Sequence, residues 1–465
     1  MQEKSTLIIG AGLCGSLLGL RLAQRGYQVK LIEKRPDLRK NEISAGRSIN
    51  LALSNRGLKA MKLVGIEEKV KELCIPMHGR MIHQKDRDEF LSPYSGLTSE
   101  YINSISRTRL NALLLDEAEK FPNVEILFNH TCLDVNLEAA TATFKDETNQ
   151  EEKQFKSDVI FGADGAGSIV RKSMWEDRLF LFSFSQNFLT HGYKELSIPP
   201  TKDGGYRLVK NALHIWPRGE NMVIALPNLD GSFTVTLFMA YEGGEYNLNN
   251  LNTPEKVEAY FKETYPSAYP HMPTLTQDFF ENPTSPLGTV KCYPWSCSGK
   301  TLLIGDAAHA IVPFYGQGMN ASFEDVVVLD KIIEENPTSN WKSIFDTYQK
   351  ERKADADAIA DLAIDNFHEM KSHTAAEIFQ KKRKIETALE QKHPKKYASK
   401  YRLVTFREDL GYNKAMKKGR AQDKAILSLL NKGVIDTEMN LEDLLHKINQ
   451  ETQEILNEDA ILRGM

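Results

Sequence analysis

The chain has 465 residues, a formal net charge of −4 and a pI near 6.3. This length allows two or three subdomains with an ample core, and the small net charge gives no electrostatic case for nucleic acid as a partner. The five cysteines are odd in number and include no Cys-x-x-Cys pair, so the sequence predicts neither a disulfide framework nor a zinc site. We expect a small-molecule partner and no bound metal.

No segment reaches the roughly 18 uninterrupted apolar residues that a transmembrane helix requires. The apolar run from Leu7 to Leu20 is broken by four glycines and lacks a cleavage-like end, which argues against a signal peptide. Near the C-terminus, one apolar stripe of a soluble amphipathic helix is formed by Leu441, Leu444, Leu445 and Ile448. We therefore expect a cytoplasmic protein without a transmembrane segment.

The first motif in chain order is Gly10-x-Gly12-x-x-Gly15, with Glu33 at the end of the following strand. The surrounding strand, helix and strand are predicted at Thr6–Ile9, Leu17–Arg25 and Gln28–Ile32. This order is typical of a βαβ dinucleotide site, in which the glycines allow the turn, the approach of the pyrophosphate and close helix packing, and the acid binds the ribose. The motif alone does not distinguish NAD from FAD.

The middle of the chain changes its pattern several times. Pro76–Pro93 is predicted to be extended, a hairpin is predicted over Val124–Lys145, and a strand enters the glycine turn of Asp158–Arg171. Further β-rich runs, which predict an antiparallel sheet, and one helix follow at Ala212–Trp216, Asn221–Leu226, Ser232–Ala240 and Pro254–Tyr265. Residues 222, 224 and 226 alternate, so their side chains share one face of the sheet.

A third glycine loop, Gly305–Asn320, joins the predicted strand Thr301–Ile304 to a helix that begins near Met319. Its glycines let backbone N–H groups approach a flat ligand at a helix N-terminus, and Asp306 can accept a hydrogen bond from a sugar-like hydroxyl. Residues 341–372 are predicted as one helix, and 374–465 as mostly helical. The basic cluster Lys381–Lys384 is interpreted as part of solvated helix faces.

Three such loops exceed what an NAD dehydrogenase needs but match the length of FAD. Together with seven further segments they resemble the kynurenine 3-monooxygenase family, one of the group A FAD-dependent aromatic hydroxylases. The resemblance runs from about residue 5 to about residue 420. The further segments are Gly46–Ser54, Gly79–His83, Pro93-Tyr94, His214–Pro217, Ala225–Asn228, Ser232–Phe238 and Tyr401–Phe406.

The resemblance implies an α/β protein with three parts. These are an FAD-binding Rossmann-like domain of the hydroxybenzoate hydroxylase fold, an antiparallel-sheet substrate domain and a helical C-terminal region. The expected bounds are residues 1–75, 96–180 and 286–340 for the first, 76–95 and 181–285 for the second, and 341–465 for the third.

The resemblance also implies an activity. Members hydroxylate L-kynurenine to 3-hydroxy-L-kynurenine with NADPH and O2 through a flavin C4a-hydroperoxide, in tryptophan degradation and in quinolinate and NAD biosynthesis. No second Gly-x-Gly-x-x-Gly domain is present, so NADPH is expected to bind transiently on the surface of the FAD domain. The ring amine of kynurenine already activates the ring, so we assign no side chain as general acid or base. The sequence leaves open whether the chain is a monomer or a homodimer.

The resemblance and the three loops together select two sets of site residues. The predicted FAD contacts are Gly10, Gly12, Leu13, Gly15, Glu33, Lys34, Arg35, Ala52, Arg107, Leu133, Asp164, Asp306, Pro313, Gly316, Gln317, Gly318, Met319 and Asn320. The predicted substrate contacts are Arg80, Tyr94, Asn366, Tyr401, Phe238, Met222, Ile224, Leu226 and Phe314. Relatives usually have tyrosine after the asparagine, and Phe367 departs from that pattern.

Less specific interpretations stay open for these residues. Arg80 could form an ordinary surface ion pair, the two tyrosines could be core residues, and the alternation at 222–226 also fits a plain core. His83, His214 and His309 have no metal-ligand spacing and are interpreted as structural. The function has two alternatives: a related hydroxylase for another aromatic acid, and a flavin-bearing module whose helical C-terminal region binds a partner.

Overall fold

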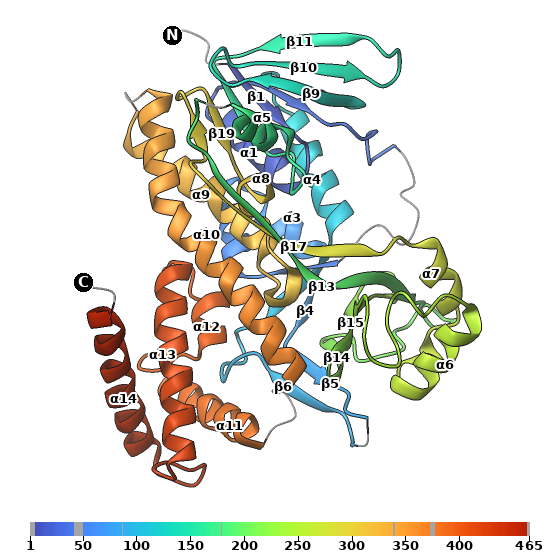
Figure 1. Ribbon diagram of the computed structural model, residues 1–465, viewed down its shortest axis with the longest axis vertical. Coiled ribbons are helices and arrows are strands. Elements are labelled where there is room, and N and C mark those ends of the chain that lie inside the picture. Colours follow the sequence, from blue (N-terminus) through green and yellow to red (C-terminus); the bar gives the residue numbers. More distant parts are fainter. Residues whose placement is uncertain are drawn as a thin grey trace. The chain divides into compact units, whose positions relative to one another are not determined.

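The computed structural model in Figure 1 describes residues 5–40, 50–85, 87–177, 179–337, 340–372 and 377–462. The chain forms two compact units, and each unit is assembled from three separate segments. Unit 1 contains Met1–Cys74, Ile105–Leu189 and Pro286–Ala360. Unit 2 contains Ile75–Ser104, Thr190–Ser285 and Asp361–Met465.

Unit 1 is built on a sheet with the strand order β18-β19-β12-β1-β2-β8. The strands are β1 (Ser5–Ile9), β2 (Gln28–Ile32), β8 (Val124–Leu127), β12 (Val159–Gly162), β18 (Ser296–Cys297) and β19 (Thr301–Leu303). All neighbours are parallel except β18 and β19. β1 and β12 are almost wholly buried, as expected for strands of a parallel sheet that is covered on both faces.

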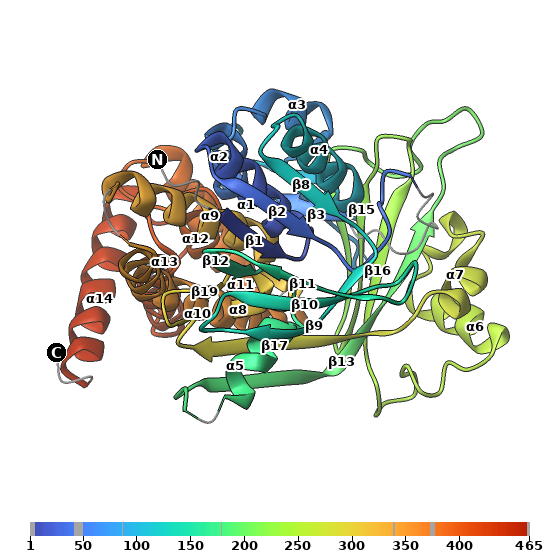
Figure 2. The same ribbon diagram turned by 90° about the horizontal axis from the view of Figure 1, so that it is seen from above.

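Helices cover one face of this sheet and a β-meander covers the other (Figure 2). α1 packs against α4 and α9 on the helical side. These helices are α1 (Leu13–Gln24), α4 (Arg107–Glu119) and α9 (Gly318–Glu335). The meander consists of β9 (His130–Asn136), β10 (Thr141–Asp146) and β11 (Glu152–Lys156), and it adds Phe144 to the same core.

The predicted hairpin at Val124–Lys145 is wrong in its first strand. β8 pairs in parallel with β2 in the central sheet, and the hairpin is formed by β9 and β10 instead. β8 follows α4 and joins the central sheet at its edge, beside β2. The short apolar run at 124–127 does not reveal which sheet receives it. The strand, helix and strand predicted around the first glycine motif are confirmed, although α1 begins earlier than expected.

The other elements of unit 1 are short, and five of the described elements extend across a unit boundary. The short elements are β3 (Asn50–Leu53), α2 (Asn55–Leu63), α3 (Glu67–Glu72), α5 (Ile169–Glu176), α8 (Asp306–His309) and the 3-10 turn η2 (Pro313–Tyr315). The elements that cross a boundary are β4 (Cys74–Met77), β7 (Ile102–Ser106), β13 (Ser183–Ile198), β17 (Ser285–Tyr293) and α10 (Trp341–Ser372). The bounds of α10 are those predicted.

Most of unit 2 is built on a sheet with the strand order β17-β13-β16-β15-β14-β5-β6. The predicted antiparallel pairing is confirmed from β13 to β14, whereas β14 and β5 pair in parallel. The strands of this sheet not yet described are β5 (Gly79–Ile82), β6 (Phe90–Pro93), β14 (Leu213–Arg218), β15 (Asn221–Pro227) and β16 (Phe233–Ala240). β4 (Cys74–Met77) precedes them in the chain. One face packs on α6 (Pro254–Thr264), the 3-10 turn η1 (Tyr269–His271) and α7 (Leu275–Glu281). Val223, Ala225 and Leu237 belong to this core.

Four helices complete unit 2: α11 (Glu377–Lys392), α12 (Lys400–Thr405), α13 (Tyr412–Asn431) and α14 (Leu441–Leu462). The predicted stripe on α14 is confirmed, because its members pack into a core with α11 and α13. The solvated interpretation of the basic cluster is wrong for Lys382, whose side chain is only 14% exposed and forms ion pairs with Glu386 and with Asp423 of α13. Asp423 also pairs with Lys400 at 2.7 Å.

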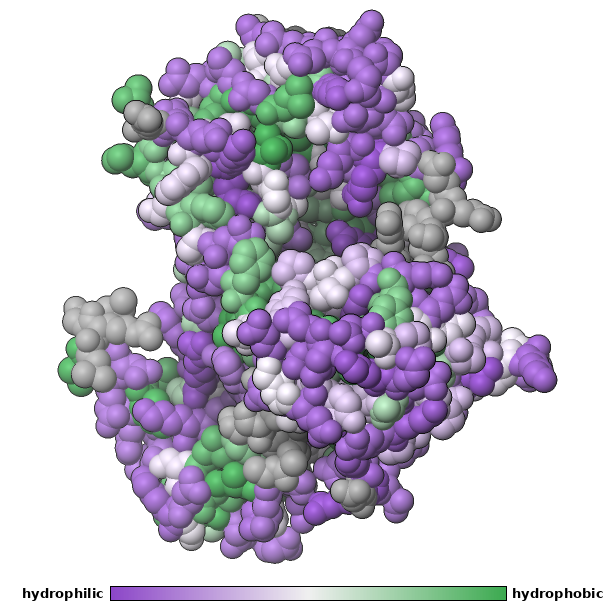
Figure 3. Space-filling view, turned by 45° about the vertical axis from the view of Figure 1, so that its right-hand side comes forward, coloured by the Kyte–Doolittle hydropathy of each residue, from purple (hydrophilic) through white to green (hydrophobic). Residues whose placement is uncertain are grey.

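The face drawn in Figure 3 is mostly hydrophilic and carries separate apolar patches. Within the described part of the chain, no helix combines the length and apolarity that would let it cross a bilayer. All five cysteines are free, and the described residues contain no cluster of three histidine, cysteine or acidic side chains suited to a metal ion.

Candidate functional site

The three glycines of the first motif have different surroundings. Gly10 adopts a positive φ of 103°, and a Cβ there would lie 2.5 Å from the carbonyl oxygen of Ala163. A Cβ on Gly15 would lie 1.9 Å from the carbonyl oxygen of Gly10, whereas a Cβ on Gly12 would meet nothing within 4 Å. Gly10 and Gly15 are therefore required by the fold, and the space at Gly12 is open to a ligand.

The N-terminus of α1 is suited to bind an anion. Its N-cap, Gly12, provides no side-chain cap, and its first turn contains no acidic residue. The first N–H groups of a helix lack intrahelical partners and carry partial positive charge. They can therefore receive a pyrophosphate, and Leu13 is the first residue of this turn.

Glu33 directly follows β2, and its carboxylate is tied to the first glycine turn. Its Oε2 accepts a hydrogen bond from Ala11 N–H at 2.9 Å. Burial raises the pKa of Glu33, but Arg35 overcomes this effect through a 2.7 Å contact, so the net pKa is lowered and the carboxylate stays charged. Lys34 and Arg35 are exposed beside it.

Asp164 follows β12 and caps α5. Its Oδ2 accepts hydrogen bonds from Ile169 N–H at 2.6 Å and Val170 N–H at 3.4 Å. Its Oδ1 is buried and accepts no hydrogen bond from the described residues, and burial raises the pKa of the group. A buried oxygen without a partner carries an energetic cost unless a ligand satisfies it, so Asp164 fits a cofactor hydroxyl.

The third loop brings its polar groups to the start of α9. Gly316 has a positive φ of 68°, and α9 begins at Gly318 without a side-chain cap. Asn320 donates to the carbonyls of Ala52 (2.8 Å) and Gly316 (3.0 Å), and its Oδ1 accepts from Ser54 N–H at 2.9 Å. The side chain of Asn320 is thus used by the protein itself, which leaves only its backbone for a cofactor.

The remaining predicted FAD residues all lie in unit 1. Arg107 is exposed at the first position of α4, and Leu133 is exposed on β9. Asp306 and Pro313 are exposed on the third loop, Met319 is half-buried and Gln317 is buried. Ala52 belongs to the predicted motif Gly46–Ser54, of which residues 46–49 lie outside the described residues.

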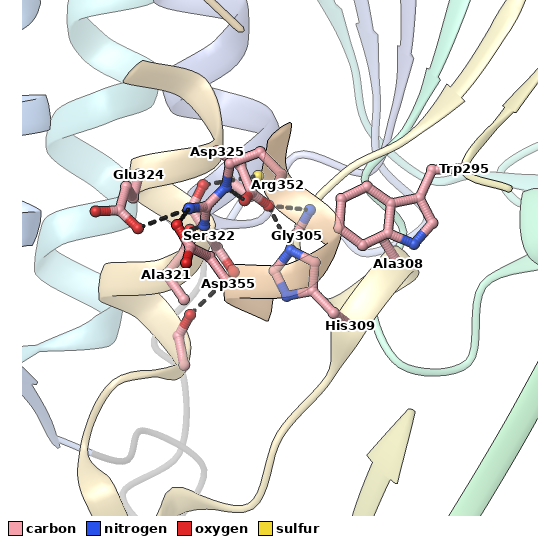
Figure 4. Close-up of polar contacts among 12 residues, drawn as sticks. Trp295, Gly305, Ala308, His309, Ala321, Ser322, Glu324, Asp325, Arg352 and Asp355 are labelled. Atoms are coloured by element: carbon pink, nitrogen blue, oxygen red, sulfur yellow. Dashed lines mark hydrogen bonds and ion pairs between the residues drawn. The ribbon is translucent and has the colours of Figure 1, made fainter. Parts of the chain in front are cut away.

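A buried ion network supports this loop (Figure 4). Asp325 Oδ2 accepts hydrogen bonds from Gly305 N–H at 3.0 Å and from His309 Nε2 at 2.6 Å, and its Oδ1 accepts from Arg352 Nε at 2.9 Å. Arg352 also pairs with Glu324 at 2.8 Å. Sequence reasoning missed Asp325 and Arg352; the signal was a pair of adjacent acids in the otherwise uncharged first half of α9.

In unit 2, Arg80 lies against two stacked tyrosines. The rings of Tyr94 and Tyr401 are 5.3 Å apart and nearly parallel, at 13°. The Arg80 guanidinium carbon lies 5.3 Å from the centroid of the first ring and 4.7 Å from that of the second. Burial raises the pKa of both tyrosines, so their hydroxyls stay protonated and can act as donors.

An apolar surface lies on the same face of the sheet as Arg80. In the register of β5, β14 and β15, Ile82 is opposite Ile215 and Ile215 is opposite Ile224, and Arg80 shares the face of Ile82. Met222 and Leu226 share this face by alternation, and Phe238 is paired with Met222. The predicted common face is therefore confirmed, and it is opposite the face that packs on α6 and α7.

Two predicted substrate residues, Asn366 and Phe314, do not lie on this face of the sheet. Asn366 is buried on the part of α10 that belongs to unit 2, and the neighbouring Phe367 ring lies edge-on to His191 at 5.0 Å. Phe314 is buried in unit 1. His83 and His214 are also not at the apolar surface: they bond to each other at 2.9 Å and stack near Trp216 on the core side.

The family model described as "FAD binding domain" matches residues 3–363. The kynurenine 3-monooxygenase of Flavobacterium psychrophilum is 46% identical over 97% of this chain and 99% of its own length. The chain belongs to the kynurenine 3-monooxygenase family. The enzyme of that name from Dictyostelium discoideum is 44% identical over 96% of this chain and 97% of its own length.

Solved structures agree on the fold. A 2-methyl-3-hydroxypyridine-5-carboxylic acid oxygenase has a TM-score of 0.63 at 18% identity, covering 84% of this chain and 96% of its own. A p-nitrophenol 4-monooxygenase from Pseudomonas putida has a TM-score of 0.64 at 16% identity, covering 84% of this chain and 95% of its own. The predicted fold class, enzyme class and FAD cofactor are confirmed.

The two glycines give a matched pair of variants. Gly15→Ala should lower the free energy of unfolding by about 3 kcal/mol, because the new Cβ overlaps the backbone of Gly10. Gly12→Ala should change the free energy of unfolding by no more than about 0.5 kcal/mol from the wild-type value. It should nevertheless weaken FAD binding at least about tenfold, because the methyl group occupies the ligand's space. Chemical denaturation and fluorescence titration with FAD measure the two effects, and equal stability losses would contradict the distinction.

The pKa of His309 predicts a pH dependence. Burial alone would lower this pKa, but the neighbouring Asp325 charge raises it above its ordinary value. The stabilisation is therefore complete below about pH 6.5 and is lost as the pH rises through the folded pKa. Relative to His309→Gln, the wild type should lose at most about 1.4 kcal/mol of unfolding free energy per pH unit in that window. Parallel stability curves for the two proteins from pH 6 to pH 9 would contradict this.

Proposed function

We propose that this enzyme hydroxylates L-kynurenine to 3-hydroxy-L-kynurenine with NADPH and O2, in tryptophan degradation towards quinolinate and NAD. The observation that carries the proposal is Arg80, which lies against the tyrosine pair on the apolar face of the unit 2 sheet. An amino-acid carboxylate matches a guanidinium, and an aromatic ring matches an apolar surface. The relatives that share nearly the whole chain carry the name of this activity.

Each part of the substrate has a matching group in unit 2. Arg80 would bind the carboxylate in a bidentate manner, and the protonated hydroxyls of Tyr94 and Tyr401 would add donors. Met222, Ile224, Leu226 and Phe238 would hold the ring and exclude water from it. Asn366 and Phe314 stay predicted contacts. No acid or base is needed, because the ring amine already supplies electron density.

The residues of unit 1 would hold FAD, which when bound accepts hydride from NADPH and activates O2 for transfer to the ring. The N-terminus of α1 would bind the pyrophosphate and Glu33 the ribose. Asp164 Oδ1 and Asp306 would accept hydrogen bonds from cofactor hydroxyls. The uncapped N–H groups at Gly318 would stabilise negative charge on the pyrimidine edge of the flavin.

The activity can be tested on the purified FAD-loaded enzyme. NADPH oxidation should be stimulated by L-kynurenine, with 3-hydroxykynurenine formed in equal amount. Stimulation that yields only peroxide would make kynurenine an effector. Absence of any response would favour a related hydroxylase that acts on another aromatic acid.

Arg80→Lys tests the carboxylate contact. Loss of the bidentate geometry should lower kcat/KM for L-kynurenine by about 10- to 100-fold, mainly through KM, and leave FAD affinity unchanged. The control is Arg420→Lys, since Arg420 is a half-exposed residue of the same unit that pairs with Asp365. Unchanged kynurenine turnover in Arg80→Lys would contradict the assignment and favour a substrate without an α-amino acid group.

A further inference from the structure

Glu390 connects the two chain segments that carry Tyr94 and Tyr401. It lies on α11 and is fully buried, with 0% of its surface exposed. Its Oε2 accepts a hydrogen bond from Gly96 N–H at 2.8 Å, and its Oε1 accepts one from Ser399 N–H at 2.8 Å. Gly96 is two residues after the first tyrosine and Ser399 is two residues before the second, so one carboxylate holds the backbone beside both.

The segment after Tyr94 lies directly against the backbone of α11. A Cβ on Gly96 would be 2.7 Å from the carbonyl oxygen of Thr387 and 2.8 Å from the backbone nitrogen of Gln391. On the other side of the tyrosine, Arg383 of the same helix donates a hydrogen bond to the carbonyl oxygen of Pro93. The tyrosine is thus held between two contacts with one helix.

The segment before Tyr401 is held in a similar way. Ser399 caps α12 by accepting a hydrogen bond from Arg402 N–H through its hydroxyl. The Arg402 Nε then donates to both carboxylate oxygens of Glu100, at 2.9 and 2.8 Å. Segments 94–100 and 399–402 are therefore connected at both ends, through Glu390 at one and Arg402 at the other.

We propose that Glu390 is a positioning residue for substrate recognition. By accepting both N–H groups it fixes the spacing of the two tyrosine rings, and with it the position of the Arg80 guanidinium that lies against them. The carboxylate is suited to this because it has acceptors only, whereas a glutamine would turn its NH2 group towards one of the two N–H donors. The role in recognition rests on the proposed function; the backbone connection does not.

Glu390→Gln tests the proposal in the FAD-loaded enzyme. KM for L-kynurenine should rise about tenfold, the equivalent of one charged hydrogen bond, with kcat within about twofold and FAD affinity unchanged. Asp146→Asn is the control, because Asp146 is a buried acid of unit 1 whose contacts include Thr148 and Lys153. A KM change that is equal in both variants, or absent in Glu390→Gln, would overturn the proposal.

Gly96→Ala provides a second route to the same contact. The added methyl group must push the segment away from α11, so KM should rise as in Glu390→Gln. Because both changes break one contact, the double variant should raise KM by about as much as either single one and not by their product. Multiplicative effects would show that the two residues act independently and would overturn the proposal.

Amide hydrogen exchange separates this proposal from the proposed function. In Glu390→Gln, peptides that contain Gly96 and Ser399 should both exchange faster, while peptides from α1 should not. Unchanged exchange at both positions would overturn the backbone connection whatever the substrate. Faster exchange in a protein whose wild type does not hydroxylate kynurenine would keep the connection and reject only the proposed substrate.

Discussion

Buried carboxylates that accept backbone N–H groups from distant segments support both candidate sites. Asp325 holds Gly305 at the start of the third loop, and Glu33 holds Ala11 in the first. Glu390 holds Gly96 and Ser399 beside the tyrosine pair. Asp325 and Glu390 lie on helices and Glu33 directly follows β2, whereas the donors lie at turns or segment ends.

The loss of one such hydrogen bond is costly because both partners are removed from water. A buried charge without hydrogen bonds is strongly unfavourable, and hydrogen bonds to an ionised group are about twice as strong as neutral ones. Asp325 accepts hydrogen bonds from Gly305 N–H, His309 and Arg352. The charges of His309 and Arg352 keep the pKa of Asp325 low although burial alone would raise it. The loops that would bind the cofactor are therefore positioned by charged groups in the core behind them.

The candidate sites of the two units differ in their chemistry. In unit 1 the proposed contacts are backbone N–H groups at two uncapped helix N-termini, together with the carboxylates of Glu33, Asp164 and Asp306. In unit 2 the proposed contacts are one arginine, two tyrosines and the apolar side chains of one sheet face. This difference suits a diphosphate-linked cofactor and an aromatic amino acid, respectively.

Local patterns in the sequence determined the first βαβ unit, the alternation of Met222, Ile224 and Leu226 and the bounds of α10, because each depends on neighbouring residues and their periodicity. Tertiary structure decided the sheet that receives β8, the ion pairs of Lys382 and the partners of Asp325 and Glu390. Glu390 and Gly96 are separated by 294 positions, and no local period identifies the donors of a carboxylate. Those partners follow from long-range packing, which brings the segments together only when the chain has folded.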